Sequence, residues 1–220
     1  LKNVSYIPHG VSSSFRVKTL KKSFENNLED KIIQCLYVSD VAPYKHQWHV
    51  VEGMKILRDM GVNVNLILTG GGNADGSSFS KNLLNQALSK CDPKREFISL
   101  IGYVNHERLP ELLNKADLFI FASSCENMPN TLVEAMAVGL PIACSNRGPM
   151  PEVLQDAGIY FNPENPKEIS DAVLKLINNR NLMYKIGQKA KALSEKYSWE
   201  NCADQTWKFL NQVFQKFDDK

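Results

Sequence analysis

The regular alternation of short apolar runs with segments of helical periodicity restricts the fold of this sequence more than any other feature. The run "KIIQCLYVS" (31–39) is rich in β-forming residues, and "QWHVVEGMKILRDMG" (47–61) has apolar residues at helical spacing before a closing glycine. The same change of pattern recurs along the chain. Further strands are expected at 62–70, 96–104, 117–123, 140–145 and 157–161, and further helices at 77–90, 106–116, 130–138 and 149–155.

Strands that alternate with helices predict βαβ units and a parallel sheet. The expected strands are nearly continuous apolar runs, which is typical of strands covered by helices on both faces. From about residue 166 the pattern is purely helical. We therefore expect an α/β fold, a Rossmann-like open parallel sheet with helices on both faces and a helical C-terminal end.

The first part of the chain differs from the rest. "NVSYIPHGV" (3–11) is strand-like, whereas residues 10–30 are polar and show no strand pattern. We interpret 1–30 as a hinge or linker segment with a short strand, and 31–220 as one Rossmann-like domain. Because the chain begins at Leu1 without a methionine, we expect it to be a piece of a longer protein, although a processed or trimmed start would look the same.

Charge and cysteine content exclude several classes of function. A formal net charge of +2 over 220 residues is too weakly basic to indicate nucleic-acid binding, but it permits an anionic ligand. Five cysteines without a CxxC pair do not predict a disulfide framework, so a reduced, cytosolic setting is favoured. No apolar run reaches the length of about 18 residues that indicates a membrane-spanning helix.

A helix start within "CENMPNTLVEAMAVGLP" (125–141) is a candidate phosphate site. We expect the helix to begin near Pro129 or Asn130, with Asn127 as its cap. The amides of residues 129–132 would then point at the preceding loop and bind an anion.

Two glutamates, Glu126 and Glu134, flank this expected helix start. Carboxylates in such places are good acceptors for sugar hydroxyls, so the pair suits a diphosphate with a sugar on each side. The alternative is ordinary stabilisation of the helix N-terminus, which contributes about 0.3–1 kcal/mol without any function. This stretch alone favours the alternative.

Ligands of such folds bind at the carboxyl edge of the sheet, and this rule picks out four loops: 39–46, 70–76, 102–106 and 123–131. "SDVAPYKHQ" (39–47) carries Lys45, which could neutralise phosphate charge, although most lysines in loops are simply solvated. "TGGGNADGSS" (69–78) has Asp75 where the dinucleotide fingerprint needs glycine and lacks the GK[ST] of a P-loop, so a flexible turn is the favoured role.

Metal chemistry finds no support in the residue spacing. The sequence contains no Asp-x-Asp pair, and no metal-ligand spacing occurs among its histidines at 9, 46, 49 and 106. The aromatic residues near the C-terminus fall at helical spacing, and we expect them to pack in the core: Tyr197, Trp199 and Trp207.

Residues 98–176 resemble the donor-binding signature of the retaining glycosyltransferases of family 4, which have the GT-B fold. "CENMPNTLVEAMAVGLPIACSNRGPMPEVLQDAGIYFNPENPKEISDAVLKLI" carries the E-x7-E pair, a small-residue helix, a "GLPI" strand and a G-x-x-F-x-P-x-x-P segment. "ISLIGYVNHERLPELLNKADLFIFAS" resembles the strand-helix-strand unit before it. "YIPHGV" resembles the family's "IPNGV" hinge, and "YSWENCADQTWKFL" resembles its terminal helix.

The resemblance implies that the chain is the donor-binding half of a two-domain enzyme whose N-terminal acceptor domain is absent from this chain. By analogy, the catalytic residues would be Glu126, which holds hydroxyls of the transferred sugar, and Lys45, which holds the diphosphate. Glu134 would bind the ribose hydroxyls. The other implied substrate-binding residues are Asn127, Met128, Pro129, Asn130 and Thr131 for the diphosphate, Tyr103 and Val104 for the base, and Ser39 beside the lysine loop.

One departure from the family pattern concerns the diphosphate. The family usually has Gly-Arg five or six residues before the lysine, and here Ser39 and Asp40 stand in that place. An acid there would repel a diphosphate unless it points away. Either Arg147 or His46 substitutes as the base, or donor binding is altered.

The implied reaction transfers a hexose from a nucleoside diphosphate sugar to a glycan or lipid-linked acceptor in surface polysaccharide or lipopolysaccharide synthesis, with retained anomeric configuration. By resemblance, "YKHQ" (44–47) favours mannose. The family needs no metal or other cofactor, and the fragment alone is expected to be inactive. We expect a cytoplasmic location. Whether the full-length protein also binds peripherally to the inner face of the membrane stays open.

Two other functions stay open at this point. A nucleotide-sugar 2-epimerase shares the fold and also pairs acids in its cleft. A non-catalytic nucleotide-sugar binding module, in which both glutamates only stabilise the helix, belongs to a different class and ranks last once the whole motif run is considered.

Overall fold

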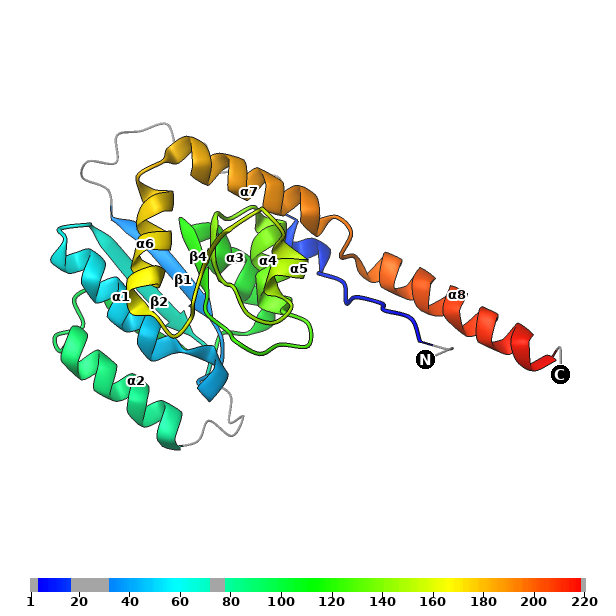
Figure 1. The fold of residues 1–220 in the computed structure, drawn as a ribbon, viewed down its shortest axis with the longest axis horizontal. Coiled ribbons are helices and arrows are strands. Elements are labelled where there is room, and N and C mark those ends of the chain that lie inside the picture. The colour runs from blue at the N-terminus through cyan, green and yellow to red at the C-terminus, as the bar shows by residue number, and fades with distance from the viewer. Residues whose placement is uncertain (1–3, 17–31, 72–77, 219–220) are drawn as a thin grey trace.

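A parallel sheet forms the centre of the computed structural model, which describes residues 4–16, 32–71 and 78–218. The strand order is β3-β2-β1-β4-β5-β6, and each neighbouring pair is parallel. The expected α/β, Rossmann-like fold is therefore confirmed (Figure 1). The strands are β1 (Ile33–Val38), β2 (Val64–Thr69), β3 (Ile98–Gly102), β4 (Leu118–Phe121), β5 (Ile142–Ser145) and β6 (Ile159–Phe161).

Helices pack against one another in two groups on the sheet. Helix α1 packs against α2 and α6, whereas α4 packs against α3 and α7. The α-helices are α1 (Gln47–Asp59), α2 (Ser78–Cys91), α3 (Leu109–Lys115), α4 (Asn130–Val138), α5 (Met150–Leu154), α6 (Pro166–Ile177), α7 (Arg180–Ser194) and α8 (Trp199–Asp218). The described 3₁₀ turns are η1 (Ser13–Phe15), η3 (Pro43–Lys45) and η4 (His106–Arg108).

The direction of the chain across the sheet reverses between β1 and β4. The chain runs outward from β1 to β2 and β3, then returns to place β4 on the other side of β1. In open parallel sheets such a switch point opens a crevice at the carboxyl ends of the strands. The loops after β1 and β4 therefore meet at the place where a ligand is expected.

Central strands form the core, but the edge strand β3 does not follow the expected pattern. All four residues of β4 and of β5 are buried, as are most residues of β1. In β3, however, Leu100 and Ile101 are 47% and 44% exposed. Among the described strands β3 pairs with β2 alone, so it is an edge strand of the sheet.

The N-terminal segment docks beside the start of α8. Residues 4–10 form no strand, so the expected short strand is reduced to a single bridge between Val11 and Ser198. A Cβ at Gly10 would lie 2.1 Å from the backbone nitrogen of Trp199, which shows how closely the two segments approach. Residues 1–3 and 17–30 of the expected hinge or linker segment lie outside the described residues.

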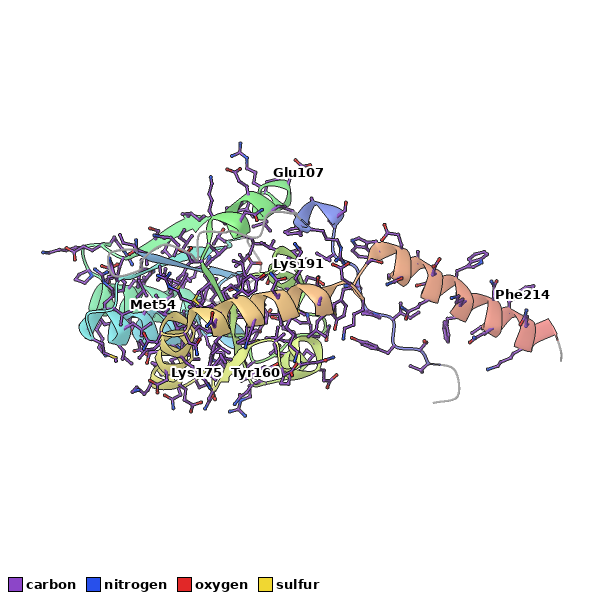
Figure 2. The ribbon with its side chains drawn as sticks, turned by 90° about the horizontal axis from the view of Figure 1, so that it is seen from above. Met54, Glu107, Tyr160, Lys175, Lys191 and Phe214 are labelled. Atoms are coloured by element: carbon purple, nitrogen blue, oxygen red, sulfur yellow. The ribbon has the colours of Figure 1, made fainter. Side chains whose placement is uncertain are left out.

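Helix α8 extends away from the sheet (Figures 1 and 2). Tyr197, just before it, is buried as expected, but Trp199 and Trp207 are 53% and 66% exposed. The expectation that these tryptophans pack in the core is therefore wrong. Helical spacing predicted that α8 has an apolar face, and in this chain nothing among the described residues covers that face at Trp207 or Phe214.

Candidate functional site

The sequence-predicted site residues gather at the carboxyl edge of the sheet. Ser39 follows β1, Tyr103 follows β3, Glu126 follows β4, and Thr131 lies in the first turn of α4. The Thr131 hydroxyl donates to the Val38 carbonyl at 3.3 Å, which places the start of α4 over the end of β1. The fold thus brings together loops that are far apart in the sequence.

Lys45 and Glu126, the two predicted catalytic residues, form an ion pair with each other. Their side chains are only 15% and 14% exposed, so the pair is shielded from most of the solvent. The Lys45 ammonium also lies 5.2 Å from the ring centre of Tyr44 and 5.8 Å from that of Phe121. Glu126 therefore balances the charge of the Lys45 ammonium, and an anionic ligand that enters the site could bind the same ammonium.

The backbone of Lys45 is fixed by residues of the sheet. The Tyr37 hydroxyl donates to the Lys45 carbonyl at 2.7 Å. Burial raises the pKa of the Tyr37 phenol well above its ordinary value, so the phenol stays protonated and remains a donor. Sequence reasoning missed Tyr37, because an aromatic residue within a strand reads as core.

The start of α4 offers fewer free amides than expected. Helix α4 begins at Asn130 with Pro129 as its N-cap, and no side chain caps it, so the predicted capping role of Asn127 is wrong. Pro129 has no N–H, and the Asn130 N–H donates to the Met128 carbonyl at 2.9 Å.

Two of the four predicted amides remain. Within the described parts of the chain, the N–H groups of Thr131 and Leu132 have no acceptor. Thr131 lines the same cavity as Ser39. Unpaired amides at a helix start form an anion site, although a smaller one than the sequence indicated.

Glu134 is held by a histidine that sequence reasoning did not assign to the site. The Nε2 atom of His106 lies 2.8 Å from Glu134 Oε1, and Glu134 is 8% exposed. Burial raises the pKa of the Glu134 carboxyl, and the hydrogen bond to His106 offsets part of that rise. The position of His106, just after the β3 loop, was the available signal.

A small cavity of about 140 Å³ adjoins Glu134. His106, Met128, Asn130, Glu134 and the N-terminal residues around His9 line it, and Trp199 closes it from the start of α8. Met128 and Asn130, both predicted to bind substrate, therefore lie on the Glu134 side of the helix start. Glu126, in the loop before α4, pairs with the loop after β1, whereas Glu134, inside α4, pairs with His106 after β3.

A second cavity, of about 230 Å³, lies over the ends of β1, β2 and β3. The predicted residues Ser39, Tyr103, Val104 and Thr131 all line it. The Gln47 side-chain amide donates to both the carbonyl and the hydroxyl of Ser39 at 2.9 Å, which fixes the floor of the cavity. The cavity thus joins the two residues predicted for the base to one of those predicted for the diphosphate, Thr131.

Gly70 is required by the close approach of two strand ends at this cavity. Its φ is +130°, and a Cβ there would lie 2.0 Å from the carbonyl oxygen of Ser39. The predicted flexible turn (69–78) therefore starts with a constrained glycine, and residues 72–77 lie outside the described residues.

Asp40, which replaces the family's arginine, is bound to the neighbouring loop. Its Oδ1 atom accepts a hydrogen bond from the Gly71 N–H at 2.9 Å. The carboxylate still lines the larger cavity, so its charge is oriented and partly neutralised but not removed from the site.

The two substitute bases considered for this arginine have other surroundings. Arg147 is half exposed and lies 3.9 Å from Glu164 and 3.5 Å from the Asn162 side chain, in the loop after β6. Burial lowers the pKa of His46, which therefore stays neutral at pH 7. In this structure Lys45 is the cation that shares the site with Glu126.

Metal clusters and membrane-spanning helices are both absent from the residues that the structure describes. Within 4–16, 32–71 and 78–218, no group of three or more His, Cys, Asp or Glu side chains could hold a metal ion. In the same ranges, no helix has the length and hydropathy needed to cross a membrane. The metal independence expected from the sequence stays a prediction.

Comparisons with known proteins agree with this geometry. The family model "Glycosyl transferases group 1" matches residues 18–193. O-antigen chain mannosyltransferase B of Escherichia coli is 28% identical over 172 residues, which cover 78% of this chain and 44% of the enzyme. Alpha-D-kanosaminyltransferase of Streptomyces kanamyceticus is 24% identical, over 81% of this chain and 45% of its own length. The chain thus spans under half the length of these curated relatives.

Solved structures share the fold at low sequence identity. HepE of Anabaena, in complex with UDP and glucose, has a TM-score of 0.78 and 18% identity, over 93% of this chain and 56% of its own. Sucrose-phosphate synthase of Thermosynechococcus elongatus has a TM-score of 0.80 and 18% identity, over 96% of this chain and 52% of its own. From its matched sequence and its fold, the chain belongs to the group 1 glycosyl transferases.

Proposed function

We propose that this chain is the donor-binding half of a retaining hexosyltransferase that uses a nucleoside diphosphate sugar. The observation that carries the proposal is the shielded Lys45–Glu126 pair beside the open start of α4. A cation and a carboxylate in the loops after β1 and β4, with unpaired amides at the start of the following helix, suit a diphosphate attached to a sugar.

The diphosphate binds at Lys45 and the amides of Thr131 and Leu132. As the bond to the sugar breaks, negative charge grows on the leaving phosphate, and these groups are already oriented toward it. Preorganised donors of this kind are worth about 100- to 1,000-fold in rate each. The Asp40 carboxylate repels this negative charge, and the hydrogen bond that it accepts from the Gly71 N–H weakens the repulsion.

Two carboxylates recognise the sugars on either side of the diphosphate. Glu126 accepts hydrogen bonds from hydroxyls of the transferred sugar, and it has to share its carboxylate between the sugar and Lys45. Glu134 accepts from the ribose hydroxyls once the His106 ring moves or shares Oε1. The base binds in the larger cavity at Tyr103 and Val104.

The acceptor is a glycan or lipid-linked sugar bound by a preceding domain, and its hydroxyl attacks on the face that the leaving group occupies. The E. coli relative, an O-antigen mannosyltransferase, supports mannose as the sugar and surface polysaccharide synthesis as the process. HepE supports a nucleotide-sugar donor, since it was solved with UDP and glucose. Metal-independent catalysis and a cytoplasmic location belong to the same proposal.

The relatives compared above are transferases, which does not favour the 2-epimerase alternative. Product analysis of the full-length protein separates the two functions. A transferase consumes donor only in the presence of an acceptor, whereas an epimerase converts free donor without one.

Saturation-transfer NMR with GDP-mannose, UDP-glucose and UDP-N-acetylglucosamine tests donor binding by the chain itself. We expect one of these donors to bind and to lose most of its affinity in Lys45→Met. Lys115→Met is the matched control, because Lys115 also pairs with a glutamate but lies exposed on α3. Equal affinities of the two variants, or binding of none of the three donors, would reject the proposal.

A further inference from the structure

His46 lies between the two loops that carry the proposed catalytic residues. It follows Lys45 directly, and its ring nitrogen Nε2 lies 2.8 Å from the hydroxyl of Ser124, two residues before Glu126. The residue is 7% exposed, and the rings of Trp48 and His49 pack against it. A single side chain thus joins the loop after β1 to the loop after β4.

A backbone contact runs parallel to this side-chain contact. The Ser124 N–H donates to the Tyr44 carbonyl at 2.8 Å. Together with the Tyr37 hydroxyl on the Lys45 carbonyl, these contacts fix the backbone at 44–46 relative to Ser124. The Lys45 ammonium and the Glu126 carboxylate meet between the loops that are fixed in this way.

Two features of His46 oppose folding stability. Its backbone is left-handed, with φ of +50°, at a position where glycine or asparagine would be less strained. Its other ring nitrogen, Nδ1, is buried and has no hydrogen-bond partner among the described residues. A strained, incompletely paired side chain between two functional loops points to a role beyond packing.

We propose that His46 is a positioning residue, which holds the Glu126 loop in register with Lys45 through its hydrogen bond to Ser124. The role rests on the proposed function, since it concerns the donor site. Because burial lowers the pKa of His46, the ring bonds the hydroxyl without adding a second positive charge beside Lys45.

Three variants separate this role from simple packing. His46→Gln places an amide nitrogen near the position of Nε2 and can keep the bond to Ser124. His46→Asn tolerates the left-handed backbone better than histidine, but its shorter amide falls near Nδ1 and loses the bond. Ser124→Ala removes the same hydrogen bond from the other side. The double variant His46→Asn/Ser124→Ala completes a cycle that isolates the contact.

The first measurement needs no ligand. The ¹³C resonance of the Glu126 carboxyl is followed by NMR, with Lys45→Met giving the position for a broken ion pair. We expect His46→Asn and Ser124→Ala to shift the resonance toward that position, and His46→Gln to leave it near the wild type. An unshifted resonance in both His46→Asn and Ser124→Ala overturns the positioning role.

The second measurement is the affinity for the donor that the wild-type chain binds. One lost hydrogen bond corresponds to about three- to tenfold weaker binding, and we expect this for His46→Asn and for Ser124→Ala. The double variant should bind no more weakly than either single variant, and His46→Gln should bind within about twofold of the wild type. The proposal is overturned if the losses of affinity in the two single variants multiply in the double variant. It is also overturned if the single variants lower the unfolding midpoint and leave the affinity unchanged.

The two measurements distinguish failure of the proposed function from failure of the positioning role of His46. If the wild-type chain binds none of the three nucleotide sugars, the proposed function fails. The carboxyl resonance of Glu126 still decides whether His46 positions the pair.

Discussion

Removing the Lys45 ammonium should destabilise the fold as well as weaken donor binding. Lys45→Met leaves the Glu126 carboxylate, which is 14% exposed, without its cation. Breaking a fully buried pair from one side costs about 3–5 kcal/mol, because an uncompensated charge stays behind. Since some solvent reaches this pair, we expect a loss of about 2–3 kcal/mol in the free energy of unfolding.

Urea unfolding at pH 7, followed by circular dichroism, measures this loss. Lys45→Met/Glu126→Gln should recover most of it, because the double variant buries no lone charge. The exposed Lys115–Glu111 pair is the control, and Lys115→Met should leave the midpoint unchanged within error. If Lys45→Met were as stable as Lys115→Met, the shielded ion pair would not exist in solution and the reasoning on the site would fail.

Three further predictions concern other parts of the molecule. Burial raises the folded-state pKa of Glu134 above its unfolded value of 4.5, so the carboxyl opposes folding once the pH exceeds that value. Glu134→Gln should therefore gain stability relative to the wild type between pH 4.5 and 7. A pH-independent difference in urea midpoints between the two proteins would contradict this. Gly70→Ala should lower the stability of the fold by more than about 1–3 kcal/mol, because left-handed strain adds to a clash with the backbone. Gly61→Ala, at φ of +79° with open space, should lower it less. Equal thermal midpoints of the two variants would refute the close approach at Gly70. Trp207→Ser should change stability by no more than about 0.5 kcal/mol, because the side chain is exposed, whereas Phe15→Ala in the core should lower stability by about 3–5 kcal/mol. A large loss of stability for Trp207→Ser in urea unfolding would show that α8 packs on the rest of the protein in solution.

Local chemistry explains why so much of the fold could be predicted. The strand at 31–39 depends on a run of apolar residues within one segment, and the helix at 130–138 depends on apolar spacing with a glycine at its end. Gly139, in the left-handed region, ends α4 as its position indicated. Pro110 lies in the first turn of α3, where a proline costs no hydrogen bond. Such signals need no knowledge of the rest of the molecule.

Burial of the C-terminal aromatic residues could not be predicted in the same way. Trp207 lies on an apolar helix face as its spacing indicated, but spacing does not say what covers the face. The exposed edge strand β3 shows the same limit, since its sequence resembles that of a central strand while its position in the sheet leaves Leu100 and Ile101 exposed.

The sequence by itself determined which residues stand in and around α4 and in the loop after β1, because their order along the chain places Glu126 before the helix, Glu134 inside it and Lys45 after the first strand. Only the tertiary structure decided their partners. Lys45 pairs with Glu126 and Asp40 with Gly71 between loops that follow different strands, and His106 pairs with Glu134 between the segment after β3 and α4. Those contacts depend on the strand order β3-β2-β1-β4, and apolar periodicity, which acts within one segment, does not encode the order in which segments lie side by side.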